Sequence, residues 1–232
     1  MSKENNSQRT TAPLSIYKMR NRYVEYRWSL NPQTCAYHYI VPAIFAMLKA
    51  LNLNKDVKIL DAGCGGGALI NDLYTRGFVN VWGFDASQSG INLAKKSFLE
   101  IADRFFNHDA YEPKLPPGIP QDYDLIISME VIEHLYSPEI YLENIHHWLN
   151  KNGYLIITTP YHGYIKNLAI ALANKCDWHF NPLSCAGHIK FFSQKSLSLL
   201  LEKEGFHIIK FKGVGRIPYI WKSMIFVAHK RV

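Results

Sequence analysis

The chain has 232 residues, of which 48% are hydrophobic and 19% are charged, a composition that excludes a disordered or fibrous protein. This length suits one domain with a substantial core, so disulfides or a structural metal are not needed for folding. The net charge of +7 would favour anionic substrates, nucleic acid or an anionic membrane, but scattered basic residues on a solvated surface explain it equally well.

The N-terminal part of the chain differs from the rest. Residues 1–13 are polar and lack an apolar run, which predicts a disordered tail rather than a signal peptide. Residues 14–54 mix aromatic and basic side chains and become helical in pattern, which predicts an N-terminal helical cap. The longest apolar stretch, 39–51, is shorter than the roughly twenty residues of a membrane-spanning helix.

These features also give an expectation about location. The four cysteines form no CxxC pair and nothing suggests export, so we expect reduced thiols and a cytoplasmic protein. The aromatic and basic N-terminal helix adds the hypothesis of a peripheral membrane contact.

From residue 55 to residue 232, apolar β-branched runs alternate with helical patterns. Strands are predicted at 57–63, 79–85, 105–110, 123–129, 154–160, 206–212 and 223–230, and helices at 65–76, 89–102, 138–149 and 193–205. The last two strands are close enough in sequence to be antiparallel neighbours. The alternation predicts one Rossmann-like domain of the α/β class, with a doubly wound, mostly parallel sheet and helices on both faces.

A glycine-rich loop follows the first predicted strand, in the sequence Asp61-Ala62-Gly63-Cys64-Gly65-Gly66-Gly67. Glycines there let the backbone approach a nucleoside-type ligand at the carboxyl edge of the sheet. The glycines alone also permit a dinucleotide, because Ala68 would complete that fingerprint. Asp61 favours another ligand, since its carboxylate would repel a pyrophosphate but attract the ammonium of a methionine moiety.

Three further strand ends carry candidate cofactor contacts. Asp85, followed by Ala86, can accept both ribose hydroxyls or cap the next helix. Asp109 and Ala110 can hold the adenine amino group, or Asp109 can be an ordinary turn residue. Met129 can pack beside the cofactor or belong to the core.

At these positions the chain resembles class I methyltransferases, particularly the ubiquinone-pathway O-methyltransferases and their bacterial relatives. The resemblance lies in DAGCGGG, GFDAS, HDA, DLIISMEVIEHL, LNKNGYLIITTP and HIKFFSQKSLSLLLEKEGF, over residues 55–212. It implies S-adenosylmethionine as cofactor, contacts at Gly63, Asp85 and Met129, and a seven-stranded sheet whose last strand is antiparallel. The nearest candidate for the family's N-terminal cofactor-contacting arginine is Arg27.

The segment after Met129 carries the candidate metal ligands. If it forms one turn of helix, Glu130, Glu133 and His134 share one face. The resemblance implies a divalent metal at these positions, and Mg²⁺ there would stabilise the oxyanion of a catechol-type acceptor. Alternatives are a hydrogen-bonded helix start, and His134 as a general base.

Residues 160–192 form an insertion too long for a minimal connection, and we expect it to act as a lid and to build the acceptor pocket together with the N-terminal cap. Its aromatic side chains could line this pocket and its polar groups could form hydrogen bonds with the acceptor, although each residue could instead serve packing. These residues are Tyr161, His162, Tyr164, Trp178, Phe180 and His188. With Glu130 and His134, residues His162 and His188 complete the catalytic candidates. Zinc binding by Cys176, His179, Cys185 and His188 is disfavoured, because the inner spacing is too short for a zinc finger.

The sequence therefore predicts a methyltransferase that acts on the hydroxyl of a small aromatic or lipophilic acceptor. Methylation of nitrogen or carbon on a small metabolite remains an alternative, as does a non-catalytic scaffold. RNA methylation and nucleic-acid partners are less favoured, because Ser128-Met129-Glu130-Val131 replaces the Asn/Asp-Pro-Pro-aromatic motif of amino-methyltransferases. A dehydrogenase is least favoured, because no second catalytic domain follows, and no sequence feature sets an oligomeric state.

Overall fold

The computed structural model describes residues 31–184 and 187–231. The predicted tail at 1–13, residues 14–30 of the predicted cap and the candidate Arg27 lie outside these ranges. Within them, no helix has both the length and the apolar character needed to cross a membrane.

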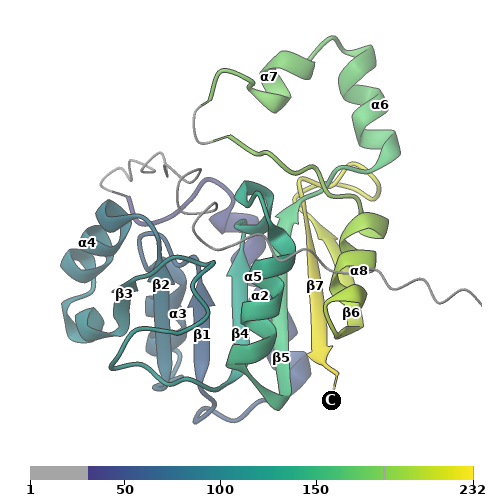
Figure 1. The fold of residues 1–232 in the computed structure, drawn as a ribbon. Helices are drawn as coiled ribbons and strands as arrows, with labels where there is room; N and C mark the ends of the chain where they lie inside the picture. The colour runs from purple at the N-terminus through teal and green to yellow at the C-terminus, as the bar shows by residue number, and fades with distance from the viewer. Residues whose placement is uncertain (1–30, 185–186, 232) are drawn as a thin grey trace, which may run out of the picture.

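Seven strands form one sheet in the order β3-β2-β1-β4-β5-β7-β6 (Figure 1). They are β1 (Ile59–Ala62), β2 (Val81–Asp85), β3 (Phe105–Asn107), β4 (Tyr123–Met129), β5 (Leu149–Pro160), β6 (Phe206–Val214) and β7 (Ser223–Lys230). The first five strands pair in parallel, and β7 runs antiparallel to both β5 and β6. The predicted fold class is confirmed, including the antiparallel last strand.

Helices cover both faces of this sheet. They are α2 (Tyr37–Leu51), α3 (Ala68–Thr75), α4 (Gln88–Ser97), α5 (Pro138–Trp148), α6 (Tyr164–Leu172), α7 (Cys176–Phe180) and α8 (Gln194–Lys203), with the 3₁₀ turns η1 (Leu99–Arg104) and η2 (Ile132–His134). Helices α2, α3 and α4 share one buried apolar cluster with the sheet, whereas α5 and α8 share the other. The β-strands between the clusters are apolar on both sides, as expected for a covered parallel sheet.

Local sequence explains where several helices begin. Ser87 caps α4, because its side chain accepts a hydrogen bond from the N–H of Gly90. Ser193 caps α8 in a reciprocal arrangement with Ser196. Pro138 begins α5 at a position where its missing N–H costs no helical hydrogen bond.

Several predicted boundaries differ from the structure, two of them by more than the others. The predicted helix at 89–102 ends at Ser97, and the chain continues as η1, in which Ile101 leaves helical geometry. Phe98 and Ile101 turn inward at this point and pack into the core. Strand β5 begins at Leu149 rather than at 154, because Leu149 pairs with Tyr123 before a register shift.

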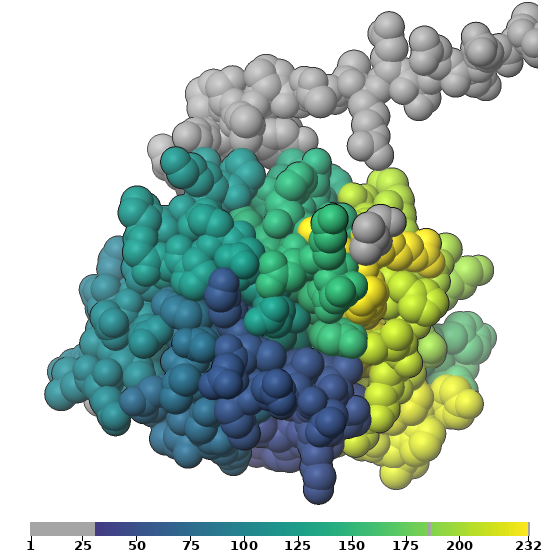
Figure 2. All heavy atoms as spheres, turned by 90° about the horizontal axis from the view of Figure 1, so that it is seen from below, coloured from purple at the N-terminus to yellow at the C-terminus, as the bar shows by residue number. Residues whose placement is uncertain are grey.

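The N-terminal and C-terminal segments meet on one side of the molecule. Helix α2 packs against β6 and β7, and the view from below in Figure 2 shows early and late segments side by side. The carboxyl edge of the sheet carries the loops after β1, β2, β4 and β5. Helices α6 and α7 of the insertion project beyond this edge (Figure 1).

Candidate cofactor and acceptor site

A cavity of about 920 Å³ opens at the carboxyl edge of the sheet. Its wall combines residues from 32–39, the glycine loop, the ends of β2 and β4, and residues of the insertion from 179–184 and 187–189. Both segments expected to build the acceptor pocket thus reach the cavity that holds the glycine loop.

The glycine loop requires its first glycine for steric reasons. Gly63 has φ +90°, and a side chain on it would overlap Val131. The N–H groups of Gly63 and Cys64 both donate to the carbonyl oxygen of Phe84, at 2.8 and 2.9 Å. These bonds hold the loop against the end of β2 and place its backbone in the cavity wall.

Asp85, for which a ribose contact is predicted, lies in the cavity wall. Its two carboxylate oxygens accept hydrogen bonds from the N–H of Gly65 at 2.8 Å and of Ser87 at 2.7 Å. Burial raises the pKa of Asp85, and these two N–H donors counter that rise. The alternative of Asp85 as helix cap was wrong, because Ser87 occupies that position.

Asp61 is only 2% exposed and is not one of the residues that line the cavity, although it precedes the glycine loop that does. Its Oδ1 atom receives no hydrogen bond from any residue in the described ranges. Burial, and secondarily the charge of Asp85, raises the pKa of Asp61 to about 8. An unpartnered buried carboxylate is costly, so this position fits a cationic group such as the ammonium of S-adenosylmethionine.

The other predicted cofactor residues divide into two groups. Ala86, Ala110 and Met129 line the cavity together with Gly63 and Asp85. Gly65 and Asp109 are not in its wall. Asp109 accepts a hydrogen bond from the N–H of Tyr111 at 2.9 Å, so it shapes the turn that presents Ala110.

The predicted helical turn with Glu130, Glu133 and His134 on one face was wrong. Glu130 has φ +56°, and the 3₁₀ turn begins only at Ile132. The Oε1 atom of Glu130 accepts from the hydroxyl of Thr158 at 2.9 Å, whereas Oε2 of Glu133 accepts from that of Thr159 at 3.0 Å. Because consecutive strand residues point to opposite faces, the two carboxylates bond to hydroxyls on opposite faces of β5.

The three predicted Mg²⁺ ligands are therefore not brought together on one helical turn. Ser223 donates to the second carboxylate oxygen of Glu130 at 3.0 Å, so hydroxyl donors engage both oxygens. The ligand atoms that do lie together among the described residues belong to Glu133, His134 and His188.

Glu130 instead belongs to a network that the sequence did not reveal. Ser223 lies 3.3 Å from the hydroxyl of Tyr39, so Tyr39, Ser223 and Glu130 form a chain of hydroxyls ending at a carboxylate. All three line the cavity. Burial raises the pKa of Glu130 to about 7, against the opposing effect of its hydroxyl donors. No local pattern could have identified Tyr39 and Ser223, since 184 residues separate them.

The predicted catalytic histidines occupy two neighbouring cavities. His134 and His188 line the main cavity, with ring centroids 4.9 Å apart. His162 lines a second cavity of about 490 Å³, whose wall shares Phe180 and His188 with the first. Burial lowers the pKa of both His162 and His188 to about 4, which keeps the rings neutral at physiological pH.

The aromatic residues of the insertion are divided between wall and surface. Phe180 lines both cavities, and Tyr161 is buried against Trp221 at a centroid distance of 5.1 Å. Tyr164 and Trp178 are about four-fifths exposed and line neither cavity. Of the possible zinc ligands, Cys185 lies outside the described residues.

Comparison with known proteins identifies the family. A family model described as a methyltransferase domain matches residues 30–210. A ubiquinone biosynthesis O-methyltransferase from Ruegeria sp. (strain TM1040) is 30% identical over 210 residues, which cover 84% of this chain and 79% of that protein. The corresponding protein from Hydrogenovibrio crunogenus is 23% identical over 193 residues, covering 83% and 80%.

Solved structures share the fold. A magnesium protoporphyrin IX methyltransferase from Synechocystis PCC 6803 with bound SAH superposes with a TM-score of 0.63 at 21% identity, covering 82% of each chain. An S-adenosylmethionine dependent methyltransferase from Mesorhizobium loti gives 0.63 at 17% identity, covering 86% of this chain and all of that one. With the family model spanning most of its length, this chain belongs to the methyltransferase domain family and is an S-adenosylmethionine-dependent methyltransferase.

Proposed function

We propose that this enzyme methylates a hydroxyl group of a small aromatic or lipophilic molecule. The observation that carries the proposal is the position of Glu130, a carboxylate with a pKa of about 7 in the wall that also contains Asp85 and Met129. A hydroxyl must lose its proton for methylation, whereas a neutral amine can attack through its lone pair. A base titrating near neutral pH therefore favours an oxygen acceptor.

The chain's own residues supply binding and proton transfer. Bound S-adenosylmethionine would provide a methyl group activated by its positively charged sulfur. Asp85 would hold the ribose hydroxyls and Asp61 would attract the ammonium. Glu130 would take the proton of the acceptor hydroxyl, while Thr158 and Ser223 hold its carboxylate in place. Positioning two reactants in one cavity can supply effective molarities of about 10⁵–10⁸ M.

The surface around the site supports a lipophilic acceptor and a peripheral membrane contact. Large apolar side chains are exposed on α6, on and after α7, and in the β6–β7 loop: Tyr164, Ile165, Leu168, Leu172, Trp178, Leu183, Ile217 and Tyr219. Apart from the buried Lys166, the segments 160–192 and 213–222 contain four basic residues, Lys175, Lys190, Arg216 and Lys222, and one acidic residue, Asp177. Apolar and aromatic side chains among basic ones suit an anionic lipid surface, from which such an acceptor could enter.

The test combines cofactor binding with product analysis. Calorimetry should show one S-adenosylmethionine site, and Asp85→Asn should weaken it at least tenfold. Glu130→Gln should keep cofactor affinity but lower kcat about 10²–10⁴-fold, the usual contribution of a general base. The labelled-methyl product from cell extracts, identified by mass spectrometry, should be a methyl ether.

Glu139→Gln is the matched control, because Glu139 is exposed at the start of α5 and is not in the cavity wall. It should leave both measurements unchanged. A product methylated on nitrogen or carbon would overturn the assignment to a hydroxyl, and failure to bind S-adenosylmethionine would overturn the proposed function as a whole.

A further inference from the structure

The second cavity, of about 490 Å³, is lined by residues of the insertion and adjoins the main cavity. The two walls share Phe180 and His188, so one molecule can extend from the main cavity into the second. Among the described residues, the second wall consists of aromatic, polar and proline side chains without a carboxylate: His162, Asn167, Phe180, Pro182, His188 and Phe191. A ligand there meets rings and hydrogen-bonding groups, but no negative charge in the wall.

His162 brings hydrogen-bonding atoms without partners to this cavity. The residue is 6% exposed, and neither of its ring nitrogens has a hydrogen-bond partner among the described residues. The Oδ1 atom of Asn167 is also buried without such a partner in the part of the chain that the structure describes. Buried polar groups without partners are costly, so this part of the wall fits a polar ligand.

Aromatic contacts hold the ring of His162 in place. It stacks on Phe180, with centroids 5.9 Å apart and an interplanar angle of 23°, and Phe191 lies edge-on to it at 5.0 Å. The backbone is also held, since the N–H of His162 donates to the carbonyl oxygen of Phe192 at 3.0 Å. The ring nitrogens therefore have a defined position in the cavity wall.

A buried cation lies close to the second cavity. Lys166 directly precedes Asn167 and is 5% exposed. Burial lowers the pKa of His162 and of His188 to about 4, and the charge of Lys166 contributes to both shifts. The two rings are therefore neutral at pH 7, and each can donate one N–H to a ligand.

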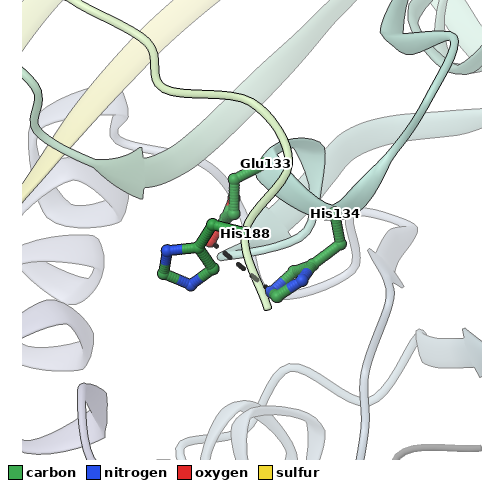
Figure 3. Close-up of side chains that lie close together, drawn as sticks. All are labelled: Glu133, His134 and His188. Atoms are coloured by element: carbon green, nitrogen blue, oxygen red, sulfur yellow. Dashed lines mark ion pairs between the residues drawn. The ribbon is translucent and has the colours of Figure 1, made fainter. Parts of the chain in front are cut away.

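Two buried carboxyl groups occur nearby, and neither lines the second cavity. His188 converges with His134 and Glu133, with one ligand atom of each within 4.8 Å of the others (Figure 3). Burial raises the pKa of Glu133 well above its usual range, which favours its neutral form. Glu130 lines only the main cavity. The second cavity thus lies near the charge of Lys166 without a carboxylate in its own wall.

N–H donors, aromatic ring edges and a nearby cation together suit an anion. We propose that the second cavity binds a carboxylate substituent of the methyl acceptor, while the hydroxyl to be methylated lies in the main cavity. This assignment rests on the proposed hydroxyl methylation and narrows the acceptor to hydroxylated aromatic acids. His162 donates its N–H to the carboxylate, and a half-turn of the Asn167 amide adds an N–H donor.

The experiment uses the full chain saturated with S-adenosylhomocysteine, which fills the cofactor site without methyl transfer. Benzoate and benzamide have nearly the same shape but differ in charge. Calorimetric titration at pH 7 should show that benzoate binds at least tenfold more tightly, because charge-assisted hydrogen bonds are stronger than neutral ones. In nuclear magnetic resonance spectra, benzoate should shift the imidazole proton signals of His162, which are identified by their loss in His162→Phe.

Three variants make the outcome specific. His162→Phe keeps a ring against Phe180 but should abolish the preference for benzoate, and Asn167→Leu should reduce it. Circular dichroism and S-adenosylhomocysteine binding verify that each variant folds. His207→Phe is the matched control, because His207 is exposed on β6 and lines neither cavity, so it should keep the preference.

Three results would overturn the proposal: equal or tighter binding of benzamide, an undiminished benzoate preference in both His162→Phe and Asn167→Leu, or no binding of either probe. The proposed function is judged separately, from S-adenosylmethionine binding and from the methyl ether product. A methyl ether formed on a neutral acceptor would thus leave the proposed function standing without the carboxylate site.

Discussion

Asp61 is a buried carboxylate whose Oδ1 atom has no hydrogen-bond partner among the described residues. Its pKa of about 8 in the folded chain lies above the value of about 3.9 expected in the unfolded chain. The folded state therefore binds more protons between these values. Stability should be fully present below pH 4 and should fall as the pH rises toward 8.

Asp61→Asn should make the free protein more stable and at the same time weaken its binding of S-adenosylmethionine. The asparagine side chain does not have to take up a proton on folding, so at pH 7.5 the free protein should gain about 1–2 kcal/mol, or roughly 2–8 °C in Tm. The same change should weaken S-adenosylmethionine binding at least tenfold, because the cationic amino group loses its partner. Thermal unfolding at pH 5 and 7.5, with calorimetric titration, measures both effects.

Asp124 provides the matched comparison for Asp61. Its carboxylate accepts hydrogen bonds from the N–H of Lys58 and the side chain of Asn150, at 2.9 and 2.8 Å. Asp124→Asn should therefore lower stability and leave cofactor affinity intact. If Asp61→Asn also lowers stability while keeping full cofactor affinity, Asp61 is a structural carboxylate and its proposed role is wrong.

At the scale of elements, one buried cation attaches α6 to the sheet. Lys166 lies on the inner side of this otherwise exposed helix, with Nζ 2.7 Å from the carbonyl oxygen of Tyr161 and 3.3 Å from that of Lys222. Burial lowers the pKa of Lys166 to about 8, which still leaves it mostly charged at pH 7. These bonds link the start of the insertion to the loop before β7.

Lys166→Met should loosen this attachment. Hydrogen bonds to a charged group contribute about 1.5–3 kcal/mol, so opening of α6 should become about ten- to a hundredfold more frequent. Hydrogen exchange of the α6 amides measures this opening. Lys175→Met, on an exposed lysine just after the helix, should leave exchange unchanged, and equal exchange in both variants would show that Lys166 is not the attachment.

Helices and strands could be predicted where their formation depends on residues close in sequence. The positions of the strands and of the capped helices follow from periodicity and from residues such as Ser193, which act within a few positions. The turn at 130–134 was missed because its sequence suits a helix. Its geometry is determined by Thr158 and Thr159, which lie 28 and 26 residues further along the chain.

At the scale of the whole molecule, exposed apolar surface gathers near the site, and the proposed membrane contact follows from this distribution. The full chain should co-sediment with vesicles that contain anionic phospholipid, and less so at high salt. Leu168→Asp with Leu172→Asp should reduce binding at least tenfold, because each leucine contributes about 1.5–3 kcal/mol when buried.

Leu199→Asp tests whether the effect depends on position. Leu199 is exposed on α8, outside the insertion, and its replacement should leave vesicle binding unchanged. Absence of co-sedimentation at low salt would remove the membrane proposal. An equal loss of vesicle binding in both variants would show that binding does not depend on the exposed leucines of α6 in particular.

The sequence by itself determined the α/β alternation, the glycine loop, and the positions of Asp61 and Asp85 at the ends of neighbouring strands. Each depends on periodicity, on backbone freedom at glycine or on the ends of parallel strands, and all of these are local patterns. The tertiary structure alone decided which carboxylate faces which partner. The alternation of side chains along β5 sends Glu130 toward Tyr39 and Ser223 and sends Glu133 to the other side, where pairing with the insertion brings His188 beside it.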